Sequence, residues 1–226
     1  SDVYKRQENN RVIRIYRILR MEKNMALLLS VLEQGMIYGI LALGVYITYK
    51  ILDFPDLTVD GSFPFGAAIT VRLINGFGVP AILTLPIAFL GGALVGICTG
   101  LIHVKLKVRD LLSGIIMMTG LYTINLWVAG SGYVAIFDKE NIFNNSFVNS
   151  ITPGFLVNFK NVIIIFLITM VAKYLLDWYM STKSGFLLRA VGDNDTIVTS
   201  LGVDKGLVKI VGLSIACLLY TSPSPR

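Results

Sequence analysis

The sequence predicts an all-α protein, a polytopic integral membrane bundle with about five to six membrane-crossing helices. Three observations support this class. Of the 226 residues, 54% are hydrophobic and only 15% are charged. The mean hydropathy of +0.70 is far above that of a soluble domain. Apolar runs that approach or reach the length of a bilayer crossing recur along the chain, so a soluble protein with a buried core is the weaker interpretation.

The apolar runs cover residues 25–52, 61–74, 79–104, 111–130 and 162–180, and a sixth begins near residue 207. The second run is short for a full crossing. The third holds Gly92, Gly96 and Gly100, so one face of its helix lets another backbone approach closely. The fifth carries Lys173 and Asp177 four residues apart. We favour a pair near the membrane boundary over a proton relay.

Charges in the loops predict the side of the membrane on which each loop lies. The basic stretches 103–109 and 183–189 predict cytoplasmic loops, whereas the long, asparagine-rich stretch 131–159 predicts an external one. Two topologies remain open for the start of the chain. If the first three runs all cross, the N-terminus lies outside. If the N-terminus lies inside, one run does not cross, and the short second run is the candidate.

The segment LDFPDLTVDGSFPFGAA, residues 52–68, separates the first two runs. Pro55 ends the preceding helix, and Asp53 and Asp60 suit turn or N-cap positions. We therefore expect irregular backbone, which membrane depth tolerates only where protein or water surrounds it. A metal or proton site that includes Asp56 is a weaker hypothesis, because no histidine or cysteine accompanies the aspartates. The third interpretation of this segment is an unwound element beside a translocation path.

The segment SGFLLRAVGDNDTIVTSLGVDKG, residues 184–206, predicts two short helices in a cytoplasmic loop. Its apolar face is expected to hold Phe186, Leu187 and Ala190. The expected helix ends and caps are Gly192, Asn194 or Asp195, Gly202 and Asp204. A loop of about 25 residues favours a docking platform over an ordinary ordered connection.

Motifs for catalysis are missing from the sequence. It contains no G-x-x-x-x-G-K-[ST], and so no P-loop for ATP, and no G-x-S-x-G, H-E-x-x-H or Cys/His metal spacing. Two cysteines and one histidine imply neither a disulfide nor a metal site. The net charge of +6 comes mostly from residues 1–20, so it does not indicate nucleic acid binding. We expect no enzyme activity, no metal and no cofactor in this chain.

Residues 52–68 and 184–206 together resemble the permease subunits of bacterial ABC importers, within the branched-chain amino acid and simple-sugar permease superfamily. The first segment is similar to the branch of tryptophan/tyrosine-type and uncharacterised ABC permeases. The second match is LRAVGDN at residues 188–194, followed by LGV at 201–203. The resemblance spans residues 25–216. Family members continue for further helices, so we expect a C-terminally truncated chain.

The resemblance implies a permease that moves an amino acid, aromatic by analogy, across the bacterial inner membrane. A separate ABC ATPase subunit would supply the energy, an extracytoplasmic solute-binding protein would deliver the solute, and a second permease subunit would complete a homodimer in the lipid bilayer. The substrate path is expected to hold Asp56, Thr58, Asp60 and Ser62. The ATPase-docking loop is expected to present Phe186, Arg189, Gly192, Asp193 and Asn194.

Two other functions remain open. One is an ABC permease for sugars or nucleosides. The other is an ion-coupled secondary transporter that uses Asp53, Asp56, Asp60 and the pair Lys173 and Asp177. The sequence shows no clear inverted repeat, which weakens this second alternative.

The ends of the chain differ from its middle. SDVYKRQ at the start and YTSPSPR at the end resemble translated adapter sequence. We therefore expect a non-native leader over residues 1–20, a partial transmembrane permease domain over residues 21–216, and a non-native tail over residues 217–226.

Overall fold

The structure is a computed structural model that describes residues 2–130, 160–200 and 202–221. All regular secondary structure within them is helical, which confirms the predicted all-α class. The elements are α1 (Asp2–Tyr46), η1 (Ile47–Ile51), α2 (Val59–Phe77), α3 (Ala81–Leu106), α4 (Asp110–Ala129), α6 (Lys160–Met180), α7 (Lys183–Asp193), α8 (Asp195–Ser200) and α9 (Lys205–Tyr220). The expected external loop, 131–159, lies outside the described residues.

Four helical stretches of the described chain are long and apolar enough to cross a membrane. They are Lys23–Ile51, Leu83–Leu106, Asp110–Ala129 and Asn161–Met180. Large apolar side chains stay exposed along them, among them Leu90, Trp127 and Leu167. Such exposure suits helices whose outer faces meet lipid instead of water. The predicted polytopic membrane class is confirmed.

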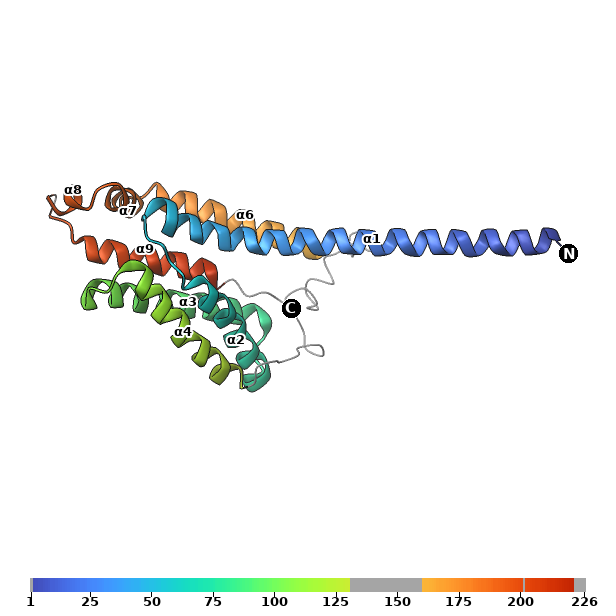
Figure 1. Cartoon of the computed structure of the whole chain (residues 1–226), viewed down its shortest axis with the longest axis horizontal. Coiled ribbons are helices and arrows are strands. Elements are labelled where there is room, and N and C mark those ends of the chain that lie inside the picture. The colour runs from blue at the N-terminus through green and yellow to red at the C-terminus, as the bar shows by residue number, and fades with distance from the viewer. Residues whose placement is uncertain (1, 131–159, 201, 222–226) are drawn as a thin grey trace.

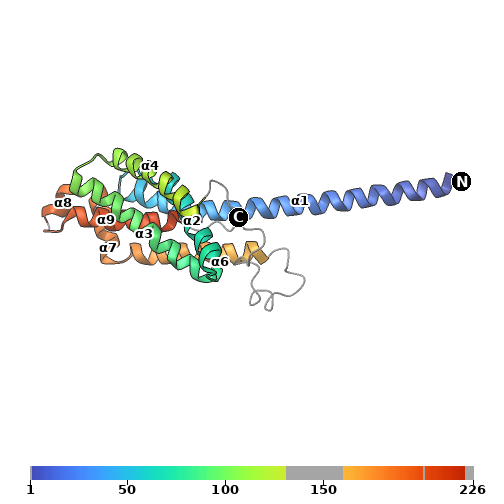
Figure 2. The same cartoon turned by 90° about the horizontal axis from the view of Figure 1, so that it is seen from below.

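The helices lie side by side along one axis, with α7 and α8 at one end of the bundle (Figures 1 and 2). α1, α3 and α6 run toward this end, whereas α2, α4 and α9 run away from it. The basic stretches 103–109 and 183–189 therefore share one end, as predicted. We refer to it as the cytoplasmic end, following the distribution of basic residues. The first half of α1 extends beyond the bundle at the opposite end.

The second apolar run forms α2 and passes along the bundle, although α2 is not among the four spans above. Gly61 at its start packs on Leu121 of α4. One turn later Gly66 packs against Thr221, beyond the far end of α9. α2 thus leads away from the cytoplasmic end. This path supports the topology in which the first three runs all cross and the N-terminus lies outside.

The centre of the bundle is a close contact between α3 and α9. A Cβ atom on Gly100 would lie 2.9 Å from Ile210 Cα, and one on Gly96 would meet the Leu213 carbonyl. Between these helices, the Ser214 hydroxyl donates a hydrogen bond to the Ala93 carbonyl at 3.1 Å. The predicted small-residue face is confirmed, because glycine lets the two backbones approach within van der Waals distance.

Residues 52–58 join η1 to α2 without regular structure, as predicted. Phe54, at the start of this segment, contacts His103 in the last turn of α3, with ring centroids 5.2 Å apart. Thr58, at its end, reaches Cys217, three turns into α9. The irregular backbone therefore extends from the cytoplasmic end into the bundle. Protein buries Phe54, Asp56 and Thr58 of this segment, which is the condition for non-helical backbone at membrane depth.

Candidate functional site

Asp56 lies at the centre of the irregular segment and is only 1% exposed. Its Oδ1 accepts a hydrogen bond from the Thr58 backbone N–H at 2.9 Å, and its Oδ2 accepts one from the Thr58 hydroxyl at 2.8 Å. An aspartate that binds the backbone two residues ahead closes a tight turn. This turn starts α2 at Val59. The structure therefore places Asp56 and Thr58 together in a buried turn that positions α2.

Two side chains of α9 complete this buried polar cluster. Cys217 Sγ lies 3.4 Å from the Thr58 hydroxyl, and the Tyr220 hydroxyl lies 2.9 Å from the Thr48 hydroxyl of η1. All four side chains are fully buried. Sequence reasoning missed Cys217 and Tyr220, because it assigned both to the expected tail. Their spacing of three residues in the sixth apolar run is the signal that could have placed them on one helix face.

The other two expected path residues lie in the first turn of α2 with different surroundings. Ser62 is fully buried, and its hydroxyl donates to the Val59 carbonyl at 3.4 Å. Asp60 is exposed. Asp60 is therefore the only one of these four residues that is exposed. The role of the set as a substrate path stays a prediction.

Asn125 of α4 adds a polar group that sequence reasoning did not single out. Its side-chain Nδ2 donates to the Gly61 carbonyl at 3.0 Å, in the first turn of α2. Its Oδ1 is buried and has no hydrogen-bond partner within the described part of the chain. A buried amide oxygen without a donor is costly, so it is a candidate acceptor for a bound solute. An asparagine inside an apolar run was the available sequence signal.

The three aspartates of this region do not converge. Asp53 and Asp60 are exposed, whereas Asp56 is buried. Among the described residues, no group of three or more histidine, cysteine, aspartate or glutamate side chains is placed to hold a metal ion. Lys173 and Asp177 form an exposed ion pair at 3.1 Å on α6. This exposure agrees with the boundary pair that the sequence favours over a proton relay.

The segment 184–206 folds into two short helices, α7 and α8, as predicted. Asn194 Oδ1 caps α8 by accepting a hydrogen bond from the Thr196 backbone N–H at 3.0 Å. Asp204 Oδ1 caps α9 by accepting one from the Gly206 N–H at 2.8 Å. These bonds satisfy N–H groups that a helix start leaves unpaired. The caps predicted at Asn194 and Asp204 are confirmed.

The expected apolar face of α7 is wrong at Phe186, whereas Ala190 packs partly buried against the core. Leu188 and Val191 are buried, whereas Phe186 is 60% exposed. Leu188 packs over Gly212, which lies beside Leu52. The side on which η1 and α9 approach α7 thus decides which apolar residues are covered. The sequence predicted that this helix would end at Gly192, but it continues to Asp193.

Four of the five expected docking residues face outward at the cytoplasmic end. They are Phe186, Arg189, Asp193 and Asn194, and we refer to them as the docking surface. Gly192 instead faces the bundle, where a Cβ atom would collide with the Ile51 carbonyl of η1. The structure therefore links the outer helix α7 directly to the start of the irregular segment. Whether the docking surface binds an ATPase stays a prediction.

Known proteins with similar sequences come from several organisms. A tyrosine transport system permease protein of Clostridioides difficile (strain R20291) is 41% identical over 190 residues, which cover 84% of this chain and 60% of that protein. An uncharacterized protein of Rickettsia prowazekii (strain Madrid E) is 29% identical over 85% of this chain and 64% of its own length. A Methanocaldococcus jannaschii protein named "Probable branched-chain amino acid transport permease protein LivH" is 28% identical over 77% of this chain and 58% of its own length.

The chain thus spans less than two thirds of the length of each of these relatives. No solved structure matches it. A family model described as "Branched-chain amino acid transport system / permease component" matches residues 27–219, which contain both the irregular segment and the docking surface. This multi-pass membrane protein belongs to that permease family.

Proposed function

We propose that this chain acts as the transmembrane permease subunit of an ABC importer that moves an amino acid, with aromatic amino acids favoured. The observation that carries the proposal is the 41% identity to a protein named as a tyrosine transport system permease. The sequence has no P-loop, so a separate ATPase subunit would hydrolyse the ATP. The bacterial inner membrane is the compartment that this function implies.

The docking surface of α7 is where the ATPase subunit would bind. It combines a large exposed apolar side chain, Phe186, with the charged neighbours Arg189 and Asp193. Aromatic and arginine side chains are enriched among residues that dominate binding energy at interfaces. α7 is also held firmly on its inner side, through buried Leu188 and Val191. A rigid helix with an exposed outer face suits a partner that exerts force on it.

Movement of α7 would reach the membrane interior by a short route. Gly192 rests on the Ile51 carbonyl, and the irregular segment begins at the next residue. The segment ends in the Asp56–Thr58 turn, which starts α2. A displacement of α7 would therefore shift the start of α2 through backbone contacts and one buried turn. We propose this connection as the coupling between the ATPase and the transport path.

The substrate path would run beside the start of α2. Asp60 offers an exposed carboxylate, and Asn125 offers a buried carbonyl oxygen without a donor. Both groups suit the α-ammonium of an amino acid, because each accepts hydrogen bonds. Asp56, Thr58 and Ser62 would brace this wall from inside. A second permease subunit would close the path, and a solute-binding protein would deliver solute at the end opposite to α7.

We predict that replacing Arg189 and Asp193 together with alanine will weaken binding of the partner ATPase. Both side chains are exposed, so the folded permease should remain, but interface contacts that include an arginine should be lost. Recovery of the ATPase with the affinity-purified permease should fall about tenfold or more. The measurement is co-purification from membranes of cells that express both subunits.

The matched control replaces Lys173 and Asp177 with alanine. This exposed pair also holds one cation and one carboxylate, but it lies on α6 and is not part of the docking surface. The control should recover the ATPase at the wild-type level. Unchanged recovery by the Arg189/Asp193 variant, or equal loss by both variants, would contradict the docking assignment.

A further inference from the structure

The cytoplasmic end of the bundle contains a cavity of about 490 Å³ between the α3–α4 turn and the first turns of α9. Four cationic side chains line it: Lys107, Arg109, Lys205 and Lys209. Two come from the α3–α4 turn and two from α9, a hundred positions later in the sequence. The fold thus concentrates basic residues from two separate segments around one hollow.

Two carboxylates also line the cavity, but each already has a partner. Asp110 Oδ1 lies 3.0 Å from His103 Nδ1. Asp204 Oδ1 accepts the hydrogen bond from the Gly206 N–H that caps α9. The residues that line the cavity therefore carry four cationic and two anionic side chains. The cavity is therefore suited to an anion.

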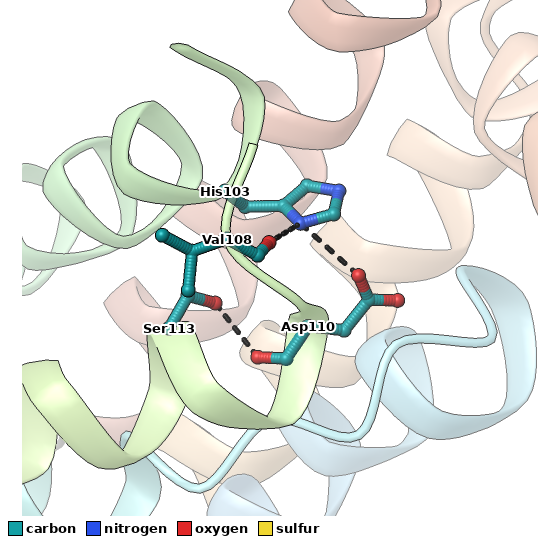
Figure 3. A network of polar contacts seen from close by, with 4 residues as sticks. All are labelled: His103, Val108, Asp110 and Ser113. Atoms are coloured by element: carbon teal, nitrogen blue, oxygen red, sulfur yellow. Dashed lines mark hydrogen bonds and ion pairs between the residues drawn. The ribbon is translucent and has the colours of Figure 1, made fainter. Parts of the chain in front are cut away.

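A network of polar contacts fixes the turn that carries two of the cations (Figure 3). His103 Nδ1–H donates to the Val108 carbonyl at 2.9 Å and faces the Asp110 carboxylate. The Ser113 hydroxyl donates to the Asp110 carbonyl at 2.7 Å. Lys107 adopts a left-handed backbone with φ of 53°, where glycine is the favoured residue. A lysine at this position keeps a cation at the cavity despite the backbone cost.

The cavity lies where the polar end of the bundle meets its lipid-facing surface. Leu106, next to Lys107, is 69% exposed, and Leu207, next to the lining residue Gly206, is 61% exposed. α3 and α4, whose connecting turn forms one wall, are both candidate membrane spans. Exposed apolar side chains directly beside clustered cations suit a ligand with an anionic head and hydrocarbon chains.

We propose that this cavity binds the phosphate-bearing headgroup of an anionic phospholipid of the cytoplasmic leaflet. The phosphate lies among the cations, and the acyl chains follow the exposed apolar surface near Leu106 and Leu207. The excess positive charge stabilises an anionic headgroup over a zwitterionic one. This site is separate from the docking surface and does not depend on the proposed transport function.

The test compares lipid retention by the purified full chain, using native mass spectrometry after detergent delipidation and addition of one lipid. We expect wild type to retain phosphatidylglycerol more strongly than phosphatidylcholine. The variant K107G/R109A should retain phosphatidylglycerol about 25-fold less, since each cation near an anionic lipid contributes roughly a fivefold factor. Glycine suits the left-handed backbone of Lys107, so this variant should fold. An unchanged thermal unfolding midpoint would confirm folding.

The matched control K50A/K183A removes two other exposed lysines that do not line the cavity. It should retain phosphatidylglycerol like wild type. Equal retention of the two lipids by wild type, or equal loss by both variants, would overturn the proposal. Displacement of phosphatidylglycerol by millimolar inorganic phosphate would assign the cavity to a free anion, and would overturn it as well.

Discussion

Replacing Gly96 with leucine is expected to destabilise the folded chain strongly. A Cβ atom at this position would meet the Leu213 carbonyl and Ser214 Cα of α9. Both are main-chain atoms inside a helix, so neither can rotate away as a flexible side chain would. Overpacking of a closely packed core typically costs about 1–3 kcal/mol, and a backbone clash lies at the upper end or above. The measurement is the thermal unfolding midpoint of the detergent-solubilised protein.

Gly120→Leu on α4 is the matched control. Apart from its chain neighbours and the nearby backbone of its own helix, no atom lies within 4 Å of a Cβ atom on Gly120, and this residue is exposed. Leucine is also a better helix former than glycine, so the control should unfold at or above the wild-type temperature. An unfolding midpoint of Gly96→Leu that equals the control's would contradict the close contact between α3 and α9.

Replacing Gly192 with valine is expected to separate α7 from η1. The added Cβ would collide with the Ile51 carbonyl, a main-chain atom that α7 cannot avoid without moving. The buried contacts of Leu188 and Val191 would be disturbed with it. Amide hydrogen exchange in α7 and η1 should accelerate about tenfold or more. A tenfold change corresponds to a loss of local stability of about 1.4 kcal/mol, which lies within the usual range for overpacking.

Arg189→Val on the same helix serves as the control, because Arg189 is exposed and is not among the buried residues of α7. Its exchange should stay near the wild-type rate. If Gly192→Val left exchange in η1 unchanged, the direct connection between α7 and the irregular segment would be wrong. The coupling route proposed above would then lose its first step.

The sequence predicted those features that local chemistry determines. Pro55 and the neighbouring aspartates indicated a break between helices, and the break lies there. Asn194 and Asp204 were recognisable as caps, since a side-chain acceptor before a helix satisfies N–H groups that the helix leaves free. Glycines repeating every four residues indicated a close helix contact. Each of these signals depends on a few consecutive residues and on one well-defined geometry.

Features that depend on contacts between distant segments were not predictable in this way. Leu187 and Leu188 are adjacent and equally apolar, so the sequence of an eleven-residue helix did not show which one is covered. Which of the two leucines is covered depends on the side from which η1 and α9 approach α7. Likewise, no local signal distinguishes the buried Asp56 from the exposed Asp60. Burial of Asp56 depends on α9, whose Cys217 completes the cluster around Thr58.

The most direct test of the proposed ABC permease function is the energy source of uptake in cells that express this chain. Uptake of labelled tyrosine and other amino acids is measured after replacing the P-loop lysine of the partner ATPase, and separately after collapsing the proton and sodium gradients at preserved ATP. We predict that the ATPase variant abolishes uptake and that gradient collapse leaves it unchanged. Uptake that survives the ATPase variant and stops with the gradients would identify an ion-coupled transporter and contradict this function.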